Sequence, residues 1–427
     1  MYPALAVLQA AKAKIDSLQG VGEQATRVSE SPGQSVSREA VAWQPSRLQL
    51  TTLWVGGIKG MEADLVKREG VRFEAIPAAG VHGVDAKALP GNLWRLMRGF
   101  FASLRILHKF QPDALLFTGG YVAVPMALAG RLSRKVKSLL YVPDIEPGLA
   151  LKTLARFADR IALTVDESKA YFPGKTNLTV TGYPLRPGLN AWSKEAARKV
   201  FALRQDMPLL LVAGGSKGAR SINMALLAVL PELLAELQVL HLCGQLDWGM
   251  VEQARNALPP QLSARYRVYP YLHKEMGAAL CAADLAVMRA GASTLGELPL
   301  LGLPAILVPY PFAWRYQKVN AQYLAERGAA EVVEDADLPE KLRPLVHQLM
   351  ANVERRQQMS LAMGALAQPQ AAEQIADLLI GSFFNLDSPR AAQPDEDTDT
   401  VQSADLEQES DPVAPTDPVA STVQVRI

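Results

Sequence analysis

Short apolar runs alternate with longer amphipathic stretches along most of the chain. The runs carry few polar side chains, which is typical of parallel strands that are buried on both faces. The stretches between them place apolar residues at helical spacing, most clearly over 219–238 and 317–327. This alternation predicts an α/β fold built on parallel sheets. The expected strands are 50–55, 114–118, 138–142, 160–164, 178–181, 209–213, 239–243, 285–288 and 305–308.

Two glycines and two prolines between 182 and 188 interrupt this pattern just before a new helix. We therefore place the domain boundary there, with a first domain over 1–183 and a second over 184–365. Residues 19–47 are rich in Gly, Ser, Gln, Glu and Pro, and we interpret them as a mobile insertion after the first helix. Residues 387–427 repeat Asp, Glu, Pro, Ser and Thr, which predicts a disordered acidic tail.

The formal net charge of +1 hides two unlike parts of the chain. Residues 387–427 contain ten acidic residues and two arginines, so the remainder carries about +9. A net charge of about +9 on residues 1–386 suits phosphorylated ligands or an anionic membrane face, but it is too small to favour nucleic acid. The 427 residues are 49% hydrophobic and 20% charged, which is typical of a globular protein.

Cysteine content and hydropathy indicate the cellular compartment in which the protein is expected. Two cysteines, Cys243 and Cys281, cannot form a disulfide framework in a chain of this size and fit a reducing environment. The longest uncharged apolar stretch, 114–130, is interrupted by glycine and proline and is shorter than the ~20 residues of a spanning helix. The first residues lack the pattern of a signal peptide. We therefore expect a cytoplasmic protein without a transmembrane segment.

Two small-residue turns in the second half join a strand to a helix. Gly214 and Gly215 follow the strand at 209–213, and Gly291 follows the strand at 285–288. Free N–H groups and the helix dipole at such a turn favour a phosphate, and Ser216 can add a hydroxyl donor. The glycine spacing matches neither the dinucleotide-binding nor the P-loop motif. A tight turn without a ligand is the alternative interpretation.

Glu297 falls in the first turn of the helix that follows the second of these turns. A carboxylate there can simply complement the helix dipole, or act as the capping-box partner of Thr294. It can also accept hydrogen bonds from two neighbouring hydroxyls of a sugar, because it has two oxygens. The local sequence does not decide between these roles.

The first half contains two further turns at strand ends. Gly119, Gly120 and Tyr121 follow the strand at 114–118, and Asp144 is one of two carboxylates that follow the strand at 138–142. Ligands of open α/β sheets bind beyond the carboxyl ends of the strands. Four such turns, spread over both halves, predict a cleft between two domains.

A helical stretch in the first half carries an apolar stripe flanked by cations. Trp94, Met97, Phe100 and Phe101 lie on one side of it, among arginines and lysines. A helix of this kind can lie in a membrane interface. Periodicity alone favours a helix packed on the sheet, whereas a lipid-linked acceptor would favour membrane contact.

Five motifs resemble, in their order and spacing, those of the MurG family of UDP-N-acetylglucosamine transferases. The resemblance covers residues 2 to about 377, apart from the insertion. It implies a GT-B fold, in which two Rossmann-like domains face a cleft and a helix over 366–386 crosses back to the first domain. The motifs are 119–122, 181–186, 214–220, 289–297 and 317–321.

The resemblance also implies an activity and partners. It implies inverting transfer of N-acetylglucosamine from UDP-N-acetylglucosamine to undecaprenyl-diphospho-N-acetylmuramoyl-pentapeptide, the step from lipid I to lipid II in peptidoglycan synthesis, on which cell shape and division depend. The enzyme would be peripheral, on the anionic cytoplasmic face of the bacterial cell membrane, without a tightly bound metal or a nucleic acid partner. Two alternatives remain open: another lipid acceptor such as diacylglycerol, or a catalytically impaired protein that only binds the nucleotide sugar.

Individual residues take roles from the resemblance. Glu297 resembles the ribose-binding glutamate, Arg186 an interdomain nucleotide contact and Gln317 the glutamine that contacts the donor sugar. The remaining matches are the diphosphate-contacting Ser216, the diphosphate turn Ala292, Ser293 and Thr294, and Leu272, whose backbone would contact uracil.

The sequence departs from the family pattern in two places. It begins inside the family's first unit, so it is truncated at the N-terminus relative to the family, and the strand, the Gly-rich loop and the proposed catalytic histidine are absent. A polar family segment corresponds here to 141–144, where Asp144 supplies the polar group. Asp144 is therefore the candidate base, with a cap or turn role as the alternative. The helix N-termini after Gly214 and Gly291, with Arg186, would stabilise the departing diphosphate.

Overall fold

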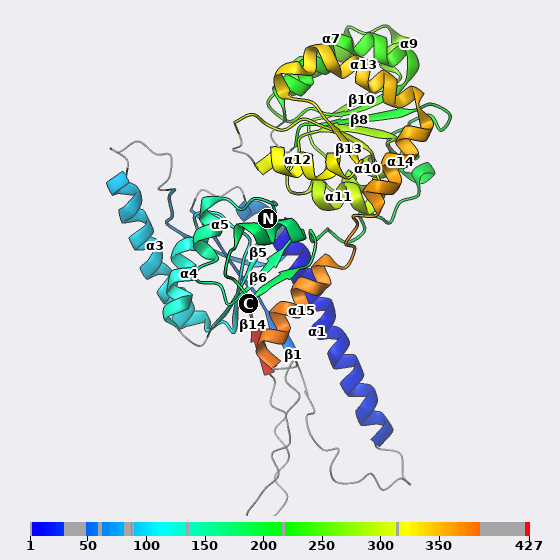
Figure 1. The fold of residues 1–427 in the computed structure, drawn as a ribbon. Helices are drawn as coiled ribbons and strands as arrows, with labels where there is room; N and C mark the ends of the chain where they lie inside the picture. Colours follow the sequence, from blue (N-terminus) through cyan, green and yellow to red (C-terminus); the bar gives the residue numbers. More distant parts are fainter. Residues whose placement is uncertain are drawn as a thin grey trace, which may run out of the picture.

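The computed structural model describes residues 2–29, 48–58, 62–80, 87, 89–133, 136–215, 218–312, 316–384 and 423–427. It contains two α/β domains, drawn in Figure 1 with the second domain above the first. All strand pairs in it are parallel, which confirms the predicted fold class.

The first domain is built on parallel strands in three groups, β4-β5-β6-β7, β2-β3 and β1-β14. The strands are β1 (Leu48–Thr51), β2 (Leu53–Gly57), β3 (Arg72–Ile76), β4 (Ala114–Phe117), β5 (Lys137–Val142), β6 (Arg160–Leu163), β7 (Leu178–Val180) and β14 (Val423–Arg426). The helices are α1 (Tyr2–Ser29), α2 (Glu62–Arg68), α3 (Leu89–Phe110), α4 (Ala123–Leu132), α5 (Leu149–Leu154), the 3₁₀ helix η2 (Asp166–Tyr171) and α15 (Ala371–Phe384).

The second domain has a six-stranded parallel sheet in the order β10-β9-β8-β11-β12-β13. Its strands are β8 (Leu209–Ala213), β9 (Gln238–Leu242), β10 (Tyr266–Tyr269), β11 (Leu285–Met288), β12 (Ala305–Leu307) and β13 (Ala330–Val332). Its helices are α6 (Lys194–Val200), α7 (Arg220–Glu236), α8 (Trp248–Asn256), α9 (Pro260–Ser263), α10 (Met276–Ala282), α11 (Thr294–Leu301), α12 (Tyr316–Glu326), the 3₁₀ helix η3 (Asp335–Asp337), α13 (Leu338–Ala351) and α14 (Val353–Gly364).

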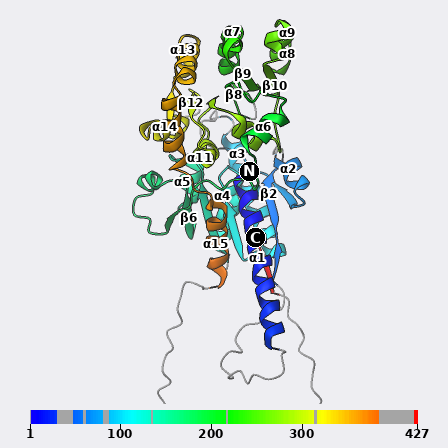
Figure 2. The same ribbon diagram turned by 90° about the vertical axis from the view of Figure 1, so that its right-hand side faces the viewer.

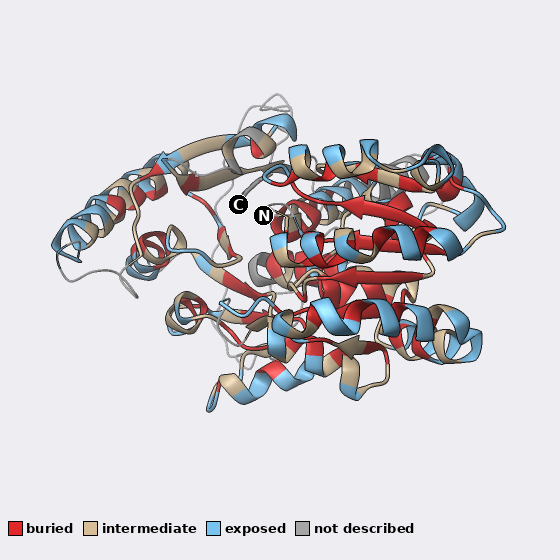
Figure 3. Cartoon of the chain, turned by 90° about the horizontal axis from the view of Figure 1, so that it is seen from above, coloured by how far each residue is buried: buried red, intermediate tan, exposed pale blue. Residues whose placement is uncertain are grey.

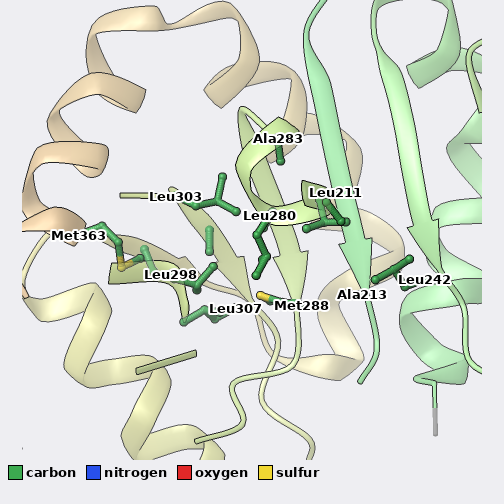
Figure 4. Close-up of a cluster of buried hydrophobic side chains, with 14 of the residues drawn as sticks. Leu211, Ala213, Leu242, Leu280, Ala283, Met288, Leu298, Leu303, Leu307 and Met363 are labelled. Atoms are coloured by element: carbon green, nitrogen blue, oxygen red, sulfur yellow. The ribbon is translucent and has the colours of Figure 1, made fainter. Parts of the chain in front are cut away.

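The core of the second domain lies between its sheet and the helices on both faces (Figure 3). Strands β8, β9 and β11 are buried along their whole length, as expected for central strands of a parallel sheet. Leu211, Leu280, Met288 and Leu298 meet in one apolar cluster below the sheet (Figure 4). This packing fixes the carboxyl ends of β8 and β11, from which the two predicted phosphate turns leave.

Helix α15 returns from the second domain to the first, where it lies beside α1 in both views (Figures 1 and 2). Its Ile375 and Leu379 pack with Val7 and Ile15 of α1 and with Leu139 of β5. The two helices thus cover one face of the first sheet together, and the chain links the domains twice.

The structure corrects two expectations. Helix α1 continues to Ser29, so residues 19–29 are helical and only 30–47 of the predicted insertion lie outside the described residues. Glutamine, glutamate, alanine and arginine in this interval are good helix formers, which offsets its glycines. In the predicted tail, 387–422 lie outside the described part, but β14 pairs in parallel with β1. The disorder predicted for the last residues is therefore wrong at the C-terminal strand.

His241 of β9 is a buried histidine away from the domain junction. Its Nε2 lies 2.9 Å from Asn223 Oδ1 and its Nδ1 lies 2.7 Å from the Tyr266 hydroxyl. The Asn223 amide nitrogen donates to Asp247, so we assign Nε2–H as donor and Nδ1 as acceptor of the tyrosine proton. Both ring nitrogens are satisfied in the neutral form, and burial lowers the pKa of His241 to about 3.

This pKa predicts an acid-sensitive stability. Below its ordinary pKa of 6.5, His241 binds a proton in the unfolded but not the folded chain. The free energy of unfolding should therefore fall by about 1.4 kcal/mol per pH unit as the pH drops from about 6 towards 3. The free energy of unfolding is measured by denaturant titration at stepped pH and plotted against pH. The slope of this plot should be shallower for His241→Gln than for the parent, whereas His347→Gln, at an exposed site, is the matched control and should keep the parent slope. Equal slopes in all three proteins would contradict the assignment.

Candidate active site

The turn after β8 leads into α7, whose N-terminus has no side-chain cap. A Cβ on Gly214 would lie 2.2 Å from the Ala219 nitrogen, and one on Gly218 would lie 2.3 Å from the Cys243 oxygen. Gly215 has a φ of +84°, which a residue with a side chain rarely adopts. The N-cap of α7 is Ala219, which has no side chain to accept from the first turn. The helix dipole and these donors suit a phosphate. The predicted Ser216 lies outside the described residues.

The turn after β11 is closed by its own hydrogen bonds. Thr294 is buried, and its hydroxyl donates to the Gly291 carbonyl over 2.6 Å. Ala292 and Ser293 stay half-buried between them. The turn is thus held rigidly at the start of α11 by small residues, which leaves room for a ligand at this helix N-terminus.

Glu297 and Arg186 lie together at this point of the junction. Burial raises the pKa of the Glu297 carboxyl, while Arg186 and a hydrogen bond from Ser293 oppose the rise. Arg186 donates to the His273 carbonyl over 3.3 Å and lies over the Tyr2 ring at 4.2 Å. Of the roles that the sequence left open for Glu297, the capping pair with Thr294 is not the one formed: the Thr294 hydroxyl donates to Gly291, and Glu297 takes a hydrogen bond from Ser293. Glu297 keeps further acceptor capacity for a ligand.

Two other predicted nucleotide-sugar residues lie in the second domain. The Leu272 side chain is buried in the core cluster, so that only its backbone could contact a base. Gln317, in the first turn of α12, accepts a hydrogen bond from the Tyr310 N–H over 2.9 Å. This bond holds the loop between β12 and α12 next to the helix.

The first domain contributes a carboxylate that is tied to the second. Asn320 of α12 is fully buried; its amide nitrogen donates to Asp144 over 2.8 Å, and its oxygen accepts from the Ile145 N–H over 3.2 Å. Burial raises the pKa of Asp144, and the Asn320 bond opposes the rise. Asn320 therefore links the domains and positions Asp144. In the sequence, Asn320 is visible only as a polar residue of the 317–321 motif, with nothing to indicate this role.

The acceptor-side glycines form the turn after β4. Gly119 and Gly120 have φ values of +104° and +90°, so both need the conformational freedom of glycine. Tyr121 is exposed, and its ring lies against Gly80, where an added Cβ would approach it to 3.0 Å. Tyr316 of α12 also reaches the first domain, since a Cβ on Gly148 would lie 3.3 Å from its hydroxyl.

Buried Tyr183 connects the two carboxylates. Burial raises its pKa, and the charges of Glu297 and Asp144 both raise it further. Its ring packs edge-on against Tyr141 at 6.3 Å between centroids. Tyr183 therefore lies within electrostatic range of both Glu297 of the second domain and Asp144 of the first.

The apolar stripe on α3 divides between surface and core. Trp94, Met97 and Phe101 are exposed by 58%, 45% and 62%, and helix α3 lies on the outer side of the first domain (Figure 1). Phe100 is half-buried and packs on the core cluster of that domain, edge-on to Phe101. Three of the four predicted membrane residues therefore point away from the protein.

The described ranges contain neither a candidate metal cluster nor a candidate membrane span. There, no three or more His, Cys, Asp or Glu side chains gather in a way that could hold a metal ion. Within the same ranges, no helix combines the length and apolarity needed to cross a bilayer.

Comparison with known proteins places this geometry in a family. Residues 45–163 match the glycosyltransferase family 28 N-terminal domain, and 209–375 match the C-terminal domain of the same family. The UDP-N-acetylglucosamine–N-acetylmuramyl-(pentapeptide) pyrophosphoryl-undecaprenol N-acetylglucosamine transferase of Roseiflexus sp. RS-1 is 44% identical over 77% of this chain and 83% of its own length. The enzyme of the same name from Desulforamulus reducens is 37% identical over 77% and 89%.

Solved structures with a similar fold agree with this family assignment. The crystal structure of Acinetobacter baumannii MurG matches with a TM-score of 0.60 at 25% identity, over 79% of this chain and 99% of that one. UDP-GlcNAc 2-epimerase from Neisseria meningitidis, bound to UDP-GlcNAc, matches with a TM-score of 0.52 at 11% identity, over 78% and 99%. The epimerase shares the fold alone. The fold of this chain is GT-B, as the resemblance to the MurG family implied.

Proposed function

The chain belongs to glycosyltransferase family 28, and from this premise we propose that it transfers N-acetylglucosamine from UDP-N-acetylglucosamine to a polyprenyl-diphosphate-linked N-acetylmuramoyl-pentapeptide. This reaction converts lipid I into lipid II during peptidoglycan synthesis. The observation that carries the proposal is that Glu297, with Arg186 nearby, lies in the first turn of α11, and that Tyr183 is within electrostatic range of both Glu297 and Asp144 of the other domain. Strand β11, which leads into α11, pairs with β8, which leads into α7. The names of the relatives supply the substrates.

The second domain would bind the nucleotide sugar. In our proposal the Glu297 carboxylate, which has two oxygens, accepts both ribose hydroxyls, and Gln317 contacts the sugar. The diphosphate would lie at the N-termini of α7 and α11. When the glycosidic bond to UDP breaks, its electron pair goes to the β-phosphate oxygen, and the helix N–H groups and Arg186 would stabilise that charge.

The first domain would activate the acceptor. In our proposal, Asp144 removes the proton of the acceptor hydroxyl as that oxygen attacks the anomeric carbon from the face opposite UDP. A carboxyl whose pKa is raised by burial is a better proton acceptor than an ordinary aspartate, and Asn320 holds it in place. In our proposal the helix N-termini and Arg186, and not a metal ion, stabilise the charge on the departing diphosphate. We therefore expect turnover to persist in EDTA, which removes divalent metal ions.

A transfer assay tests the function directly. The chain is incubated with radiolabelled UDP-N-acetylglucosamine and either a lipid I analogue or diacylglycerol in detergent, and labelled lipid is extracted. Label in the lipid I analogue alone supports the proposal. Label in diacylglycerol would show that diacylglycerol, and not the lipid I analogue, is the acceptor. UDP binding without transfer to either lipid would indicate a protein that only binds the nucleotide sugar.

We further propose that α3 docks on the anionic cytoplasmic face of the bacterial cell membrane. Trp94→Ala with Phe101→Ala should lower partitioning into phosphatidylglycerol vesicles about tenfold or more at high salt, where charge attraction is screened and apolar burial remains. The melting temperature should hold, because both rings are exposed. Leu246→Ala with Leu361→Ala, at sites exposed by 84% and 76% in the second domain, is the matched control. Equal vesicle binding by the two double variants would refute docking through α3.

A further inference from the structure

Arg289 is a charged residue at the carboxyl end of β11 to which the proposed reaction gives no role. It follows Met288, the last residue of β11, and precedes the turn at Gly291. Its side chain is only 10% exposed. Taking a guanidinium group out of water is costly unless its donors are paired, so the partners of Arg289 indicate what it does.

The guanidinium contacts the segments that follow three other strands of the same sheet. Its Nη1 donates to the Val308 and Pro309 carbonyls after β12, over 3.2 and 3.4 Å, and pairs with Asp335 of η3, the helix after β13. Its Nη2 donates over 2.7 Å to the Ser221 hydroxyl in the first turn of α7, the helix after β8. Strands β8, β11, β12 and β13 are neighbours in the sheet. One side chain therefore joins the carboxyl ends of these adjacent strands.

Ser221, Arg289 and Asp335 contact one another, and we call them the Arg289 cluster. The Ser221 hydroxyl donates to Asp335 over 2.7 Å and accepts from Arg289, while the carboxylate pairs with the guanidinium. Ser221 is the second residue of α7, and the N-cap residue Ala219 makes no side-chain bond to the helix. The cluster thus gives the first turn of α7 a side-chain anchor that its N-cap lacks.

Arg289 also contacts the loop that leads to Gln317. Its guanidinium carbon lies 5.2 Å from the centre of the Tyr310 ring, within the range of a cation–π contact. The Tyr310 N–H in turn donates to Gln317 Oε1 over 2.9 Å. The same guanidinium is therefore linked to the helix start proposed to hold the diphosphate and to the side chain proposed to contact the sugar.

We propose that the Arg289 cluster positions the donor site: it holds the first turn of α7 and the loop before Gln317 in fixed register with the turn at Gly291, without itself contacting the nucleotide sugar. This inference rests on the proposed function, since it concerns the diphosphate and sugar contacts of the same site. Donors that are held in place before the ligand arrives need no reorganisation when it binds or when charge develops.

The alternative role for Arg289 is direct contact with the diphosphate. Both of its Nη atoms already donate to protein acceptors, and Asp335 compensates its charge. A phosphate would have to compete with that carboxylate, which argues for positioning through Ser221 and Tyr310 instead.

The variant Asp335→Ala separates the two roles, because they predict opposite signs. If the cluster positions the site, loss of the carboxylate loosens Ser221 and Arg289, and UDP affinity should fall about tenfold or more. If Arg289 contacts the phosphates, the same variant frees the guanidinium and UDP should bind more tightly, which would overturn the proposal. Calorimetric titration measures UDP affinity, and NMR titration measures the affinity for uridine. Uridine lacks the diphosphate and should bind the variant as it binds the parent.

The comparison of UDP with uridine also excludes a merely structural role. A variant that only destabilises the domain would lower the melting temperature and leave both affinities unchanged, or weaken both ligands equally. Either result would overturn the proposal. Arg355→Lys, at a second-domain arginine of α14 that pairs with Glu331 over 3.0 Å, is the matched control and should keep the parent affinity for UDP.

Ser221→Ala gives a second test with little risk to folding, because it removes only a hydroxyl and alanine is a good helix former. It should weaken UDP but not uridine. It should also speed amide exchange at Asn223, whose N–H donates to the Ala219 carbonyl over 2.9 Å and closes the first turn of α7. Unchanged UDP affinity and unchanged exchange in Ser221→Ala would overturn the proposal.

Arg289→Lys keeps the charge but cannot bridge several acceptors with one planar group. It should therefore weaken UDP as Asp335→Ala does, and parent-like UDP affinity in this variant would contradict positioning by the guanidinium. If Glu297→Ala weakens UDP binding and the cluster variants do not, the positioning proposal fails alone. A parent chain that binds no UDP would overturn the proposed function as well.

Discussion

Replacing Asp144 with asparagine is expected to lower kcat about 10²–10⁴-fold with little change in the affinity for UDP. The variant keeps the size of the side chain, and thus the packing at the junction, but it cannot take the proton of the acceptor hydroxyl. Single-turnover rates with a lipid I analogue give the first quantity, and calorimetric titration with UDP gives the second. Asp166→Asn, at an exposed first-domain aspartate bonded to Lys169, is the matched control and should retain both.

The pH profile separates a base from a turn residue. The base acts deprotonated, so the rate should fall as the pH drops through the pKa of Asp144, and burial places that fall above the range of an ordinary aspartate. Asn320→Ala removes a hydrogen bond that lowers this pKa and should move the fall to still higher pH. If Asp144→Asn keeps kcat within about threefold of the parent, the carboxylate only shapes the turn and the base lies elsewhere.

The sequence predicted every central strand of the second domain but missed several strands at sheet edges, for a physical reason. The expected strands 209–213 and 285–288 coincide with β8 and β11, whose residues are all buried and therefore form unbroken apolar runs. The missed strands β3, β10 and β13 lie at sheet edges, and their partly exposed residues break such runs. β14 was missed because its partner β1 lies at the other end of the chain.

The same distinction applies to the site. Glycine turns at Gly119, Gly214 and Gly291 were visible because each follows a buried strand and the backbone conformation limits the residue type. The hydrogen bond between Asp144 and Asn320 was not visible in the sequence, because 176 positions separate the two residues and only the packing of the domains brings them together. Local patterns therefore identify which strand ends carry chemistry, whereas the way the two domains pack determines which of their side chains meet.

Glu297→Ala is expected to weaken UDP binding by about 1.5–3 kcal/mol for each charge-assisted hydrogen bond lost, or roughly 10–150-fold for one bond. Glu236→Ala is the matched control, since this second-domain glutamate is exposed and pairs with His347. The melting temperature of Glu297→Ala should not fall at neutral pH. Burial raises the pKa of this carboxyl, so its charged form destabilises the free protein relative to the unfolded chain.

The pH dependence of UDP affinity is a second measurement that tests the role of Glu297. Ribose hydroxyls would donate to the ionised carboxylate, so UDP affinity should fall as the pH drops through the raised pKa of Glu297. UDP's own terminal phosphate also titrates, and the comparison is therefore between variants: parent and Glu236→Ala should share one pH dependence, and Glu297→Ala should show a smaller one. Calorimetry in buffers of different ionisation enthalpy would detect the proton that accompanies binding. If Glu297→Ala binds UDP as the parent does at every pH, the carboxylate only complements the dipole of α11, and the ribose contact must come from another residue.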